Sequence, residues 1–314
     1  MAQEDIRDVF IAYEGHSLYV RCYDFLGVAP DEGAPTPIFL VHGLLLNPRS
    51  WCDHQIKVLQ QVGPVYSLSL PGHAPSLTPA GWNGPVTEAF IDATLTAQIS
   101  HFVEDTHKYL LIGHSTGALA CWVHAIRHPD RVLGIVSSST TCHGREMSGQ
   151  FFVYQTMVRK FGVVGRAAWW LVCRMNSINL RLHQFLVCDA AHNKKQLIAY
   201  PYFEKWMRGY FQYQKILDSR ATGAWLRDLY DIDTEDGLST ITCPVLLLYG
   251  EYDPYVATSA RLAFLHGLGN NPQVTDVVLA DTGHLHMLEA PEAFEQVVLN
   301  FIDLLPNALS RTES

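Results

Sequence analysis

The chain has 314 residues, of which 48% are apolar and 17% charged, and its formal net charge is −9 at pH 7. A chain of this length and apolar content can bury one large core, and no second independent domain is required. The acidic excess argues against nucleic acid as a partner, because a phosphate backbone is bound by clustered basic residues. The same charge disfavours a tight grip on anionic membranes.

Cysteine usage and the first residues predict a cytoplasmic protein. The seven cysteines are scattered without C-x-x-C spacing, so neither a disulfide framework nor a zinc site is expected. The chain begins with the acidic stretch MAQED and no apolar stretch follows it, so a secretory signal is not expected. We expect neither a metal nor an organic cofactor, and the oligomeric state is left open.

Apolar runs of strand length recur along the chain. An opening hairpin is expected from residues 10–13 and 17–23, around a Glu-Gly-His turn. Further strands are expected at 38–44 with its His-Gly turn, 65–70, 109–112, 132–137, 244–249 and 274–280, and a last helix at 291–305. Helix-like stretches separate most of these runs. The alternation predicts an α/β fold with a doubly wound, mostly parallel sheet.

One long segment interrupts the alternation. No clear strand appears between Thr140 and Pro244, and the sequence there is helical in character. We therefore expect a core formed by residues 1–140 and 241–314, with a helical cap inserted at 141–240.

The pentapeptide Gly113-His114-Ser115-Thr116-Gly117 follows one predicted strand and precedes a helix-like stretch. A strand, a sharp turn and a helix are the context in which G-x-S-x-G exposes a serine hydroxyl above a sheet. The two glycines let the strand and the helix approach closely. Ser115 is therefore the candidate nucleophile, and His114 is expected to be a packing and hydrogen-bonding residue.

A catalytic serine needs a base and a carboxylate, and one known order along a chain is nucleophile, acid, histidine. Asp253 follows the strand predicted at 244–249 and is the candidate acid. His284 follows the last predicted strand and is the candidate base. Asp281 is a weaker candidate for the acid, and His286 is the rival base.

The strand predicted from Ile38 ends in the turn His42-Gly43-Leu44. A loop after the third strand commonly supplies one oxyanion donor, and the residue after the nucleophile supplies the other. We therefore expect the backbone N–H groups of Leu44 and Thr116 to form an oxyanion hole. His42 and Gly43 are expected to support this loop.

Together these segments resemble the α/β-hydrolase fold family. The resemblance rests on segments that occur in family order, namely His42-Gly43, Leu70-Pro71-Gly72-His73, 113–117, 128–132, 250–253, Gly283-His284 and 289–292. It implies a sheet with a helical cap and a Ser115, Asp253, His284 triad. Family members that use an aspartate nucleophile, the dehalogenases and epoxide hydrolases, are disfavoured because the elbow residue is serine. The family hosts many reactions, so the substrate is not indicated.

The predicted cap is rich in aromatic residues. Above the carboxyl ends of the strands, such residues would wall an apolar pocket over the nucleophile. Phe151, Tyr154, Trp169 and Trp170 are the residues that we expect in this wall. The alternative is that these side chains fill the core of the cap itself.

Basic residues lie between the aromatic residues of the cap, which would let this segment lie on a membrane surface. A solvated basic face is the favoured interpretation, because Gly162 and Gly165 interrupt the helical pattern. Membrane association through the cap therefore stays the lesser alternative.

The predicted chemistry is acyl transfer from a small-molecule ester or thioester with a hydrophobic acyl or aromatic group. His284 would deprotonate Ser115, and Asp253 would orient the imidazole. Water as the acceptor gives a hydrolase, whereas an alcohol or amine gives an acyltransferase with the same triad. The sequence also leaves open a lyase and a receptor-like protein that binds a small ligand.

Overall fold

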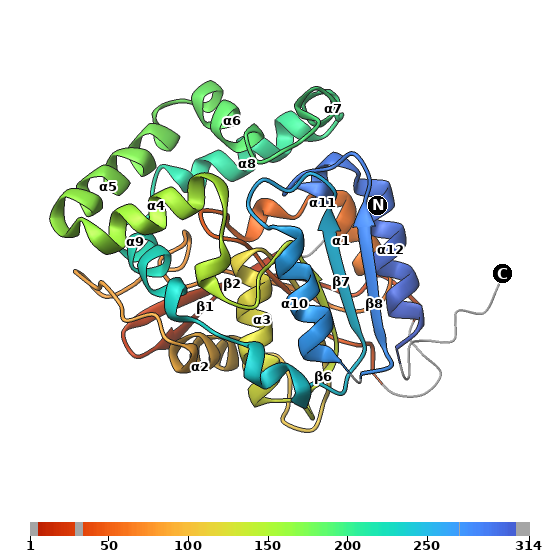
Figure 1. Cartoon of the computed structure of the whole chain (residues 1–314). Coiled ribbons are helices and arrows are strands. Elements are labelled where there is room, and N and C mark those ends of the chain that lie inside the picture. The colour runs from red at the N-terminus through yellow and green to blue at the C-terminus, as the bar shows by residue number, and fades with distance from the viewer. Residues whose placement is uncertain (1–5, 29–33, 270, 306–314) are drawn as a thin grey trace.

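The computed structural model describes residues 6–28, 34–269 and 271–305 (Figure 1). Within these residues one eight-stranded sheet has the order β1-β2-β4-β3-β5-β6-β7-β8. The strands are β1 (Ile6–Tyr13), β2 (His16–Tyr23), β3 (Ile38–Val41), β4 (Val65–Leu68), β5 (Tyr109–His114), β6 (Val132–Ser138), β7 (Val245–Gly250) and β8 (Val274–Leu279). β2 pairs antiparallel with β1 and β4, and all other neighbours are parallel. The predicted doubly wound, mostly parallel sheet is confirmed.

Helices cover both faces of the sheet (Figure 1). One face carries α2 (Glu88–Ile99), α3 (Thr116–Arg127) and α10 (Thr258–Leu268), and the other carries α1 (Asp53–Leu59) and α12 (Pro291–Asp303). The short helix α11 (His286–Glu289) precedes α12. Each central strand contributes to both layers, because successive side chains of a strand point to opposite faces. In β5, Leu111 packs in the layer of α3, and Leu110 and Ile112 pack in the layer of α12.

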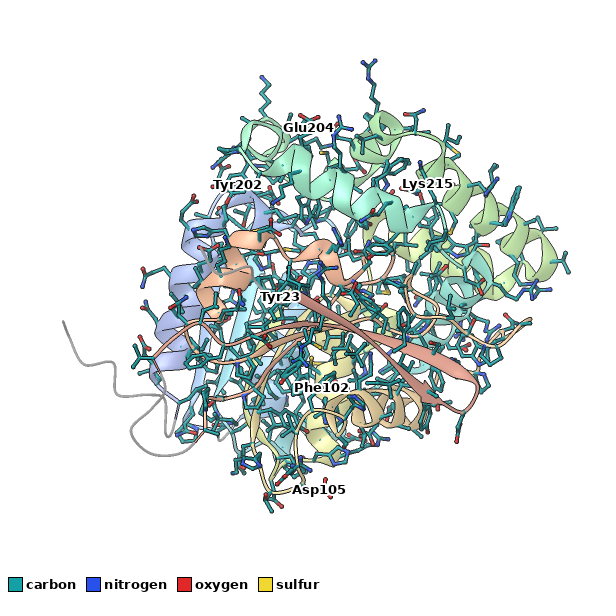
Figure 2. All side chains as sticks on the ribbon, turned by 180° about the vertical axis from the view of Figure 1, so that it is seen from behind. Tyr23, Phe102, Asp105, Tyr202, Glu204 and Lys215 are labelled. Atoms are coloured by element: carbon teal, nitrogen blue, oxygen red, sulfur yellow. The ribbon has the colours of Figure 1, made fainter. Side chains whose placement is uncertain are left out.

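A second group of helices lies over one end of the sheet. They are α4 (Gly149–Lys160), α5 (Gly162–Ile178), α6 (Leu180–Cys188), α7 (Lys194–Ala199), α8 (Phe203–Gln214) and α9 (Ser219–Asp228). Short 3-10 helices occupy Pro48–Ser50, Gly144–Glu146, Leu229–Asp231 and Glu235–Thr240. Figure 2 shows this group from behind, with Tyr202, Glu204 and Lys215 at one end of the molecule and Asp105 at the opposite end. All six helices fall inside the segment predicted as the cap, and we call them the cap below.

The two connections between the cap and the sheet run side by side. The Gly144 N–H donates to the Ile232 carbonyl at 3.0 Å, and the Thr234 N–H donates to the Cys142 carbonyl at 3.0 Å. His143 and Asp233 form an isolated antiparallel bridge between these bonds. The chain therefore enters and leaves the cap through two adjacent segments that are hydrogen-bonded to each other.

The cysteines pack mainly in the core. All seven thiols are free, and all except Cys243 are buried. Burial in apolar surroundings raises the pKa of the Cys22, Cys52 and Cys188 thiols to about 11. These residues are core-packing side chains in the structure.

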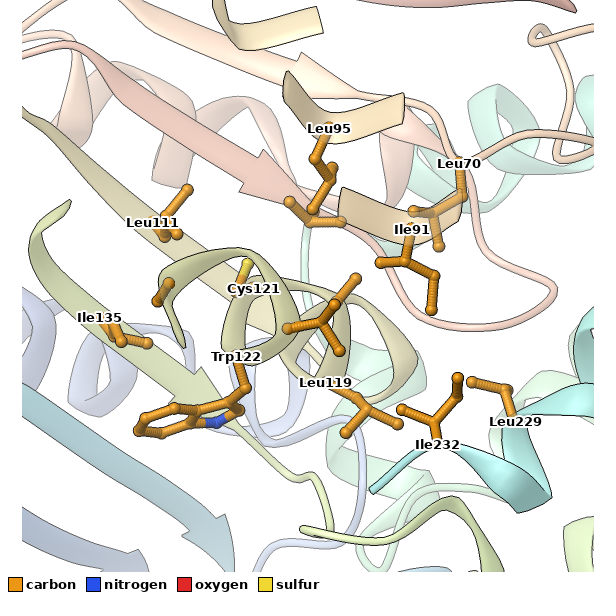
Figure 3. Packing of buried hydrophobic residues seen from close by; sticks show 14 of the residues in the cluster. Leu70, Ile91, Leu95, Leu111, Leu119, Cys121, Trp122, Ile135, Leu229 and Ile232 are labelled. Carbon is orange, nitrogen blue, oxygen red and sulfur yellow. The ribbon is translucent and has the colours of Figure 1, made fainter. Parts of the chain in front are cut away.

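The layer that contains α3 is organised around Trp122, which is fully buried (Figure 3). Its ring stacks on Phe264 of α10 with 5.0 Å between centroids. Its indole N–H donates to the Ser137 hydroxyl of β6 at 2.8 Å. One side chain thus ties two helices to the strand beside the nucleophile turn.

Replacing this side chain should strongly destabilise the fold. We expect Trp122→Ala to lower the free energy of unfolding by about 3–5 kcal/mol, because a large cavity forms and Ser137 loses its partner. Trp170→Ala is the matched control, since the Trp170 side chain is 53% exposed. Urea denaturation measures both changes. Equal losses for the two variants would contradict the role given to Trp122.

Candidate active site

Ser115 occupies a strained turn between β5 and α3. Its backbone has φ 54° and ψ −124°, a combination that residues with a Cβ rarely adopt. The Ser115 N–H donates to the Ser138 carbonyl at 2.8 Å, and its carbonyl accepts from the N–H groups of Ala118 and Leu119 at 2.9 and 3.1 Å. These three bonds hold the turn in place.

The two glycines of the pentapeptide allow helix α3 to lie against the sheet. A Cβ on Gly117 would lie 2.2 Å from the carbonyl oxygen of Val41 in β3. A Cβ on Gly113 would lie 2.4 Å from the Cα of Ala118. Any larger residue at either position would force the helix away from the strands. This is the physical reason for the G-x-S-x-G spacing here.

Asp253 and His284 form a close, buried pair. Nδ1 of His284 lies 2.8 Å from Oδ2 and 3.0 Å from Oδ1 of Asp253. The backbone N–H groups of Tyr255 and Val256 donate to Oδ1 at 2.8 and 3.1 Å. Burial by itself would raise the pKa of Asp253, but the His284 ring and these donors lower it below its ordinary value. The carboxylate is therefore ionised, and Nδ1 of His284 carries the proton that it accepts.

The His284 loop is fixed from two sides. Nε2 of His114 lies 2.9 Å from the His284 carbonyl oxygen and donates to it, which is the hydrogen-bonding role predicted for His114. The His284 N–H donates to the Ala190 carbonyl at 2.9 Å. The Tyr255 ring meets the imidazole edge-on with 5.0 Å between centroids. With Nδ1 held by Asp253, Nε2 is the ring atom left for proton transfer.

Ser115 and His284 line one cavity under the cap. Asp253 lies behind His284 and its side chain is only 2% exposed. The rival residues lie elsewhere: His286 is fully buried, and Asp281 is exposed and pairs with His192. The structure thus brings together the three residues predicted as nucleophile, acid and base.

The loop predicted to supply an oxyanion donor lies against the nucleophile. A Cβ on Gly43 would lie 3.0 Å from the Cβ of Ser115, and Leu44 and Thr116 both line the cavity. Thr116 is the first residue of α3, and the first N–H groups of a helix lack intrahelical acceptors. The oxyanion hole stays a prediction that this placement favours.

His42 holds the other end of that loop. The Leu70 N–H donates to Nε2 of His42 at 3.2 Å, so Nδ1 carries the ring proton and donates to the Gly43 carbonyl at 2.8 Å. Burial lowers the pKa of His42 to about 4. The ring is therefore neutral at pH 7, as this pair of hydrogen bonds requires.

Sequence reasoning missed a polar group behind Asp253. The Ser139 hydroxyl hydrogen-bonds the Asp253 carboxylate and lies 3.2 Å from Nδ1 of His286. Nε2 of His286 lies 2.9 Å from the Ser138 hydroxyl. Burial lowers the pKa of His286 to about 4, so this ring is neutral at pH 7. The run of serines and threonines that ends β6 is the only sequence signal for this arrangement.

Glu289 was also missed as a site residue. Its carboxylate is buried and accepts from the N–H of Gly283 at 2.9 Å, beside His284. It also accepts from the N–H groups of His192 and Asn193 in the cap, at 2.8 and 2.9 Å. Burial raises the pKa of Glu289, and the three donors oppose that rise. Glu289 therefore joins the base loop to the cap.

The cavity wall contains two of the four aromatic residues predicted for it. Phe151 and Tyr154 of α4 line the cavity. Trp169 and Trp170 do not, and that prediction is wrong. Trp169 faces α9, where a Cβ on Gly223 would lie 2.9 Å from its ring. Trp170 is the next residue along α5, so it points away from that packed face and is 53% exposed.

The described residues that line the cavity include no Asp, Glu, Lys or Arg. Most are apolar, and the polar ones are neutral amides, hydroxyls and the two histidines His114 and His284. Burial lowers the pKa of His114 well below its ordinary value. Apart from the candidate base, the wall therefore offers no charged partner to a bound molecule.

The described residues include two groups of three side chains that could hold a metal ion. In each group, every residue offers one potential ligand atom, and these atoms lie within 4.8 Å of one another. The groups are Asp92, His124 and His128, and His143, Asp233 and Glu235. None of the six lines the cavity that contains Ser115. In both groups the histidine nitrogens already pair with the carboxylates. An ion bound at either group would therefore lie outside the candidate active site.

Comparison with known families and proteins agrees with this fold. A family model described as the alpha/beta hydrolase family matches residues 38–297. A protein of Acinetobacter baylyi named (E)-2-((N-methylformamido)methylene)succinate hydrolase is 24% identical over 284 residues, which are 88% of this chain and 94% of that protein.

Solved structures share the fold. An esterase from Thermogutta terrifontis superposes with a TM-score of 0.69 at 21% identity, covering 94% of this chain and 98% of that one. The enol-lactonase from Burkholderia xenovorans superposes with a TM-score of 0.68 at 18% identity, covering 94% of this chain and 99% of that one. At these identities the likeness concerns the fold alone.

The buried histidines predict acid sensitivity. Burial lowers the pKa of His42, His183 and His286 from 6.5 to about 4, so the unfolded chain binds more protons between these values. The free energy of unfolding should therefore fall as the pH drops from 6.5 towards 4, by up to about 1.4 kcal/mol per pH unit for each group. Urea denaturation across this range measures the slope, and His286→Gln should make it shallower. If the free energy of unfolding of the native chain does not change between pH 6.5 and 4, the lowered pKa values of these histidines are contradicted.

Proposed function

The chain belongs to the alpha/beta hydrolase family and is an enzyme, and we propose that it is a serine-dependent hydrolase of uncharged, hydrophobic esters or thioesters. One observation carries the proposal: Ser115 and His284 share a cavity, and Asp253 holds Nδ1 of His284 at 2.8 Å. That arrangement leaves Nε2 of His284 to accept the Ser115 proton. Hydrolysis of esters or related substrates is also the activity in the names of similar proteins.

The proposed reaction has two halves. His284 takes the proton from Ser115, whose oxygen attacks the carbonyl carbon of the substrate. The N–H groups of Leu44 and Thr116 stabilise the oxyanion, and the leaving alcohol or thiol takes the proton from His284. Water then loses a proton to His284 and attacks the acyl-enzyme, and Ser115 regains its proton as the acid product leaves. Asp253 stabilises the imidazolium in both halves.

Thr116 has a second reason to serve as an oxyanion donor. The N-terminus of a helix carries a partial positive charge, and α3 begins at Thr116 directly after the nucleophile. Low exposure to water strengthens such interactions, and Leu44 and Leu46 beside the turn are both buried. A donor of this kind typically contributes about 3 kcal/mol to transition-state stabilisation.

The cavity wall supports an uncharged substrate. The relative from Acinetobacter is named for a succinate derivative, which carries carboxylates. Burying a carboxylate is costly unless a cation compensates for its charge, and the described lining residues of this cavity offer neutral amides and hydroxyls but no Lys or Arg. We therefore propose a substrate whose acyl group is apolar and neutral.

The nucleophile is tested with p-nitrophenyl esters of graded acyl length. We expect Ser115→Ala to lower kcat/KM by about 10⁴-fold or more, because the acyl-enzyme cannot form. Ser100→Ala is the matched control, since Ser100 is exposed at the end of α2. Intact-mass spectrometry of a slow ester should detect an acyl adduct on the native chain and none on Ser115→Ala. Turnover that survives in Ser115→Ala, or turnover without an adduct, would favour a lyase-like or other route.

Charge selectivity is tested with two acyl groups of nearly equal length. The p-nitrophenyl ester of monomethyl succinate is neutral, whereas the hemisuccinate carries one carboxylate. We expect the hemisuccinate to have a kcat/KM roughly 100-fold lower, because its carboxylate would be buried without a cationic partner. Leu186→Arg places a cation in the cavity wall and should therefore reduce the difference in kcat/KM between the two esters. Equal rates for both esters in the native chain would reject the uncharged-substrate proposal while leaving serine catalysis intact.

A further inference from the structure

The outer side of the cap exposes large apolar side chains. We define the cap patch as Phe161, Val163, Val164, Trp170, Leu171 and Phe185, whose exposed fractions run from 53% to 73%. They come from α5, α6 and the turn between α4 and α5, which form the outer edge of the cap (Figure 1). On α5, Val163 and Trp170, like Val164 and Leu171, are seven residues apart and so share one face of the helix, and an exposed apolar face usually marks an interaction site.

Helix α5 has only one packed face. Gly165, Trp169 and Cys173 recur every four residues and are buried, whereas the positions between them are mostly exposed. A surface helix normally carries polar residues on its outer side. The outer side of α5 instead carries Val163, Trp170 and Leu171. The fold of a single chain therefore leaves this face without an apolar partner.

The glycines of this region build the patch rather than disrupt it. α4 ends at Lys160 and α5 begins at Gly162, so Gly162 interrupts no helix; as the first residue of α5 it has φ 50° and open space around it. A Cβ on Gly165 would lie 2.0 Å from the Met157 carbonyl oxygen, so this glycine lets α4 and α5 pack closely. The turn thereby projects Val163 and Val164 outward, with exposed fractions of 72% and 73%.

The segment that supplies the patch carries only positive charges, and acidic residues at the start of α9 and in the turn after it lie at its edge. Residues 149–188 contain three arginines beyond Arg159-Lys160, namely Arg166, Arg174 and Arg181, and no Asp or Glu. These five cations are among the 22 Lys and Arg residues of a chain whose net charge is −9, so this segment is locally cationic on an acidic protein. Arg174 lies over the Trp170 ring at 5.8 Å, and Arg159 pairs with Asp231 at 2.9 Å. Arg166 lines a groove beside Trp170 that also contains Arg220 and Asp218.

We propose that the cap patch docks onto a membrane surface that contains anionic lipid. Trp170, Phe185 and the valine turn would enter the interface, and the arginines would lie at the level of the headgroups. Among the described residues no helix is long and apolar enough to span a bilayer, so the contact is peripheral. A second copy of the chain is the rival occupant, but a symmetric contact would bring two basic surfaces together.

The patch and the cavity share the same helices. Tyr154 of α4, Val172 of α5 and Leu186 of α6 line the cavity on the inner side of the cap. Membrane contact would therefore bring the cavity wall close to a source of apolar molecules. The docking itself does not depend on the proposed hydrolase activity, so the two are tested by separate measurements.

Docking is measured by flotation of the whole chain with phosphatidylcholine vesicles, with and without about 30% phosphatidylserine. We expect binding to the anionic vesicles that weakens as salt is added. Val163→Glu with Val164→Glu should lower the partition coefficient roughly tenfold or more. Arg166→Gln with Arg174→Gln should lower it by a similar factor on anionic vesicles only. Leu262→Glu is the matched control, because Leu262 is 56% exposed on α10, outside the cap.

Circular dichroism and thermal melting establish that each variant is folded, independently of any activity. Absence of flotation by the native chain, or equal flotation by the Val163→Glu, Val164→Glu variant, overturns the proposal. Sedimentation velocity tests the alternative that a second copy of the chain binds the cap patch. A dimer of the native chain that this double variant dissociates would assign the cap patch to a second copy.

Discussion

The candidate site depends on how closely the first turn of α3 approaches β3 and β5. Gly117 meets the Val41 carbonyl and Gly113 meets the backbone of Ala118, at distances that no Cβ would permit. This contact forces Ser115 into its left-handed conformation and directs the N-terminus of α3 at the cavity. The strain, of the order of 1–3 kcal/mol, is tolerated because three backbone hydrogen bonds hold the turn and the first ten residues of α3 are buried.

Around that turn, the polar groups are buried but satisfied. Asp253 is ionised because His284, Ser139 and two backbone N–H groups compensate for its burial. His42 and His286 are neutral because their few polar contacts do not compensate for the cost of burying a charged imidazole. The single imidazole next to a carboxylate in the cavity is His284. The candidate base therefore differs from the nearby histidines in its surroundings, because its imidazole alone both pairs with a carboxylate and faces the cavity.

Much of the fold and the core of the candidate site could be predicted from the sequence, because both depend on patterns among residues that are close along the chain. Buried parallel strands are apolar runs, and Asp253 and His284 each follow such a run, where parallel strands end at one edge of the sheet. Trp169 and Trp170 could not be assigned in this way, since the packed face of α5 is set by Gly223 of α9. Glu289 and Ser139 were missed for a related reason, because their partners are distant along the chain.

The hydrogen bonds of Glu289 tie one segment of the cap to the loop that carries the candidate base. The segment from Ala190 to Asn193 is bonded to the same loop that carries the imidazole, so it cannot lift without displacing His284. Helix α4 is tied to the other half of the pair, because the Gln150 amide donates to the hydroxyl of Tyr255, whose N–H donates to Asp253. Both segment 190–193 and α4 are therefore coupled to the Asp253–His284 pair, so a molecule that displaces either part of the cap would also shift the geometry of proton transfer.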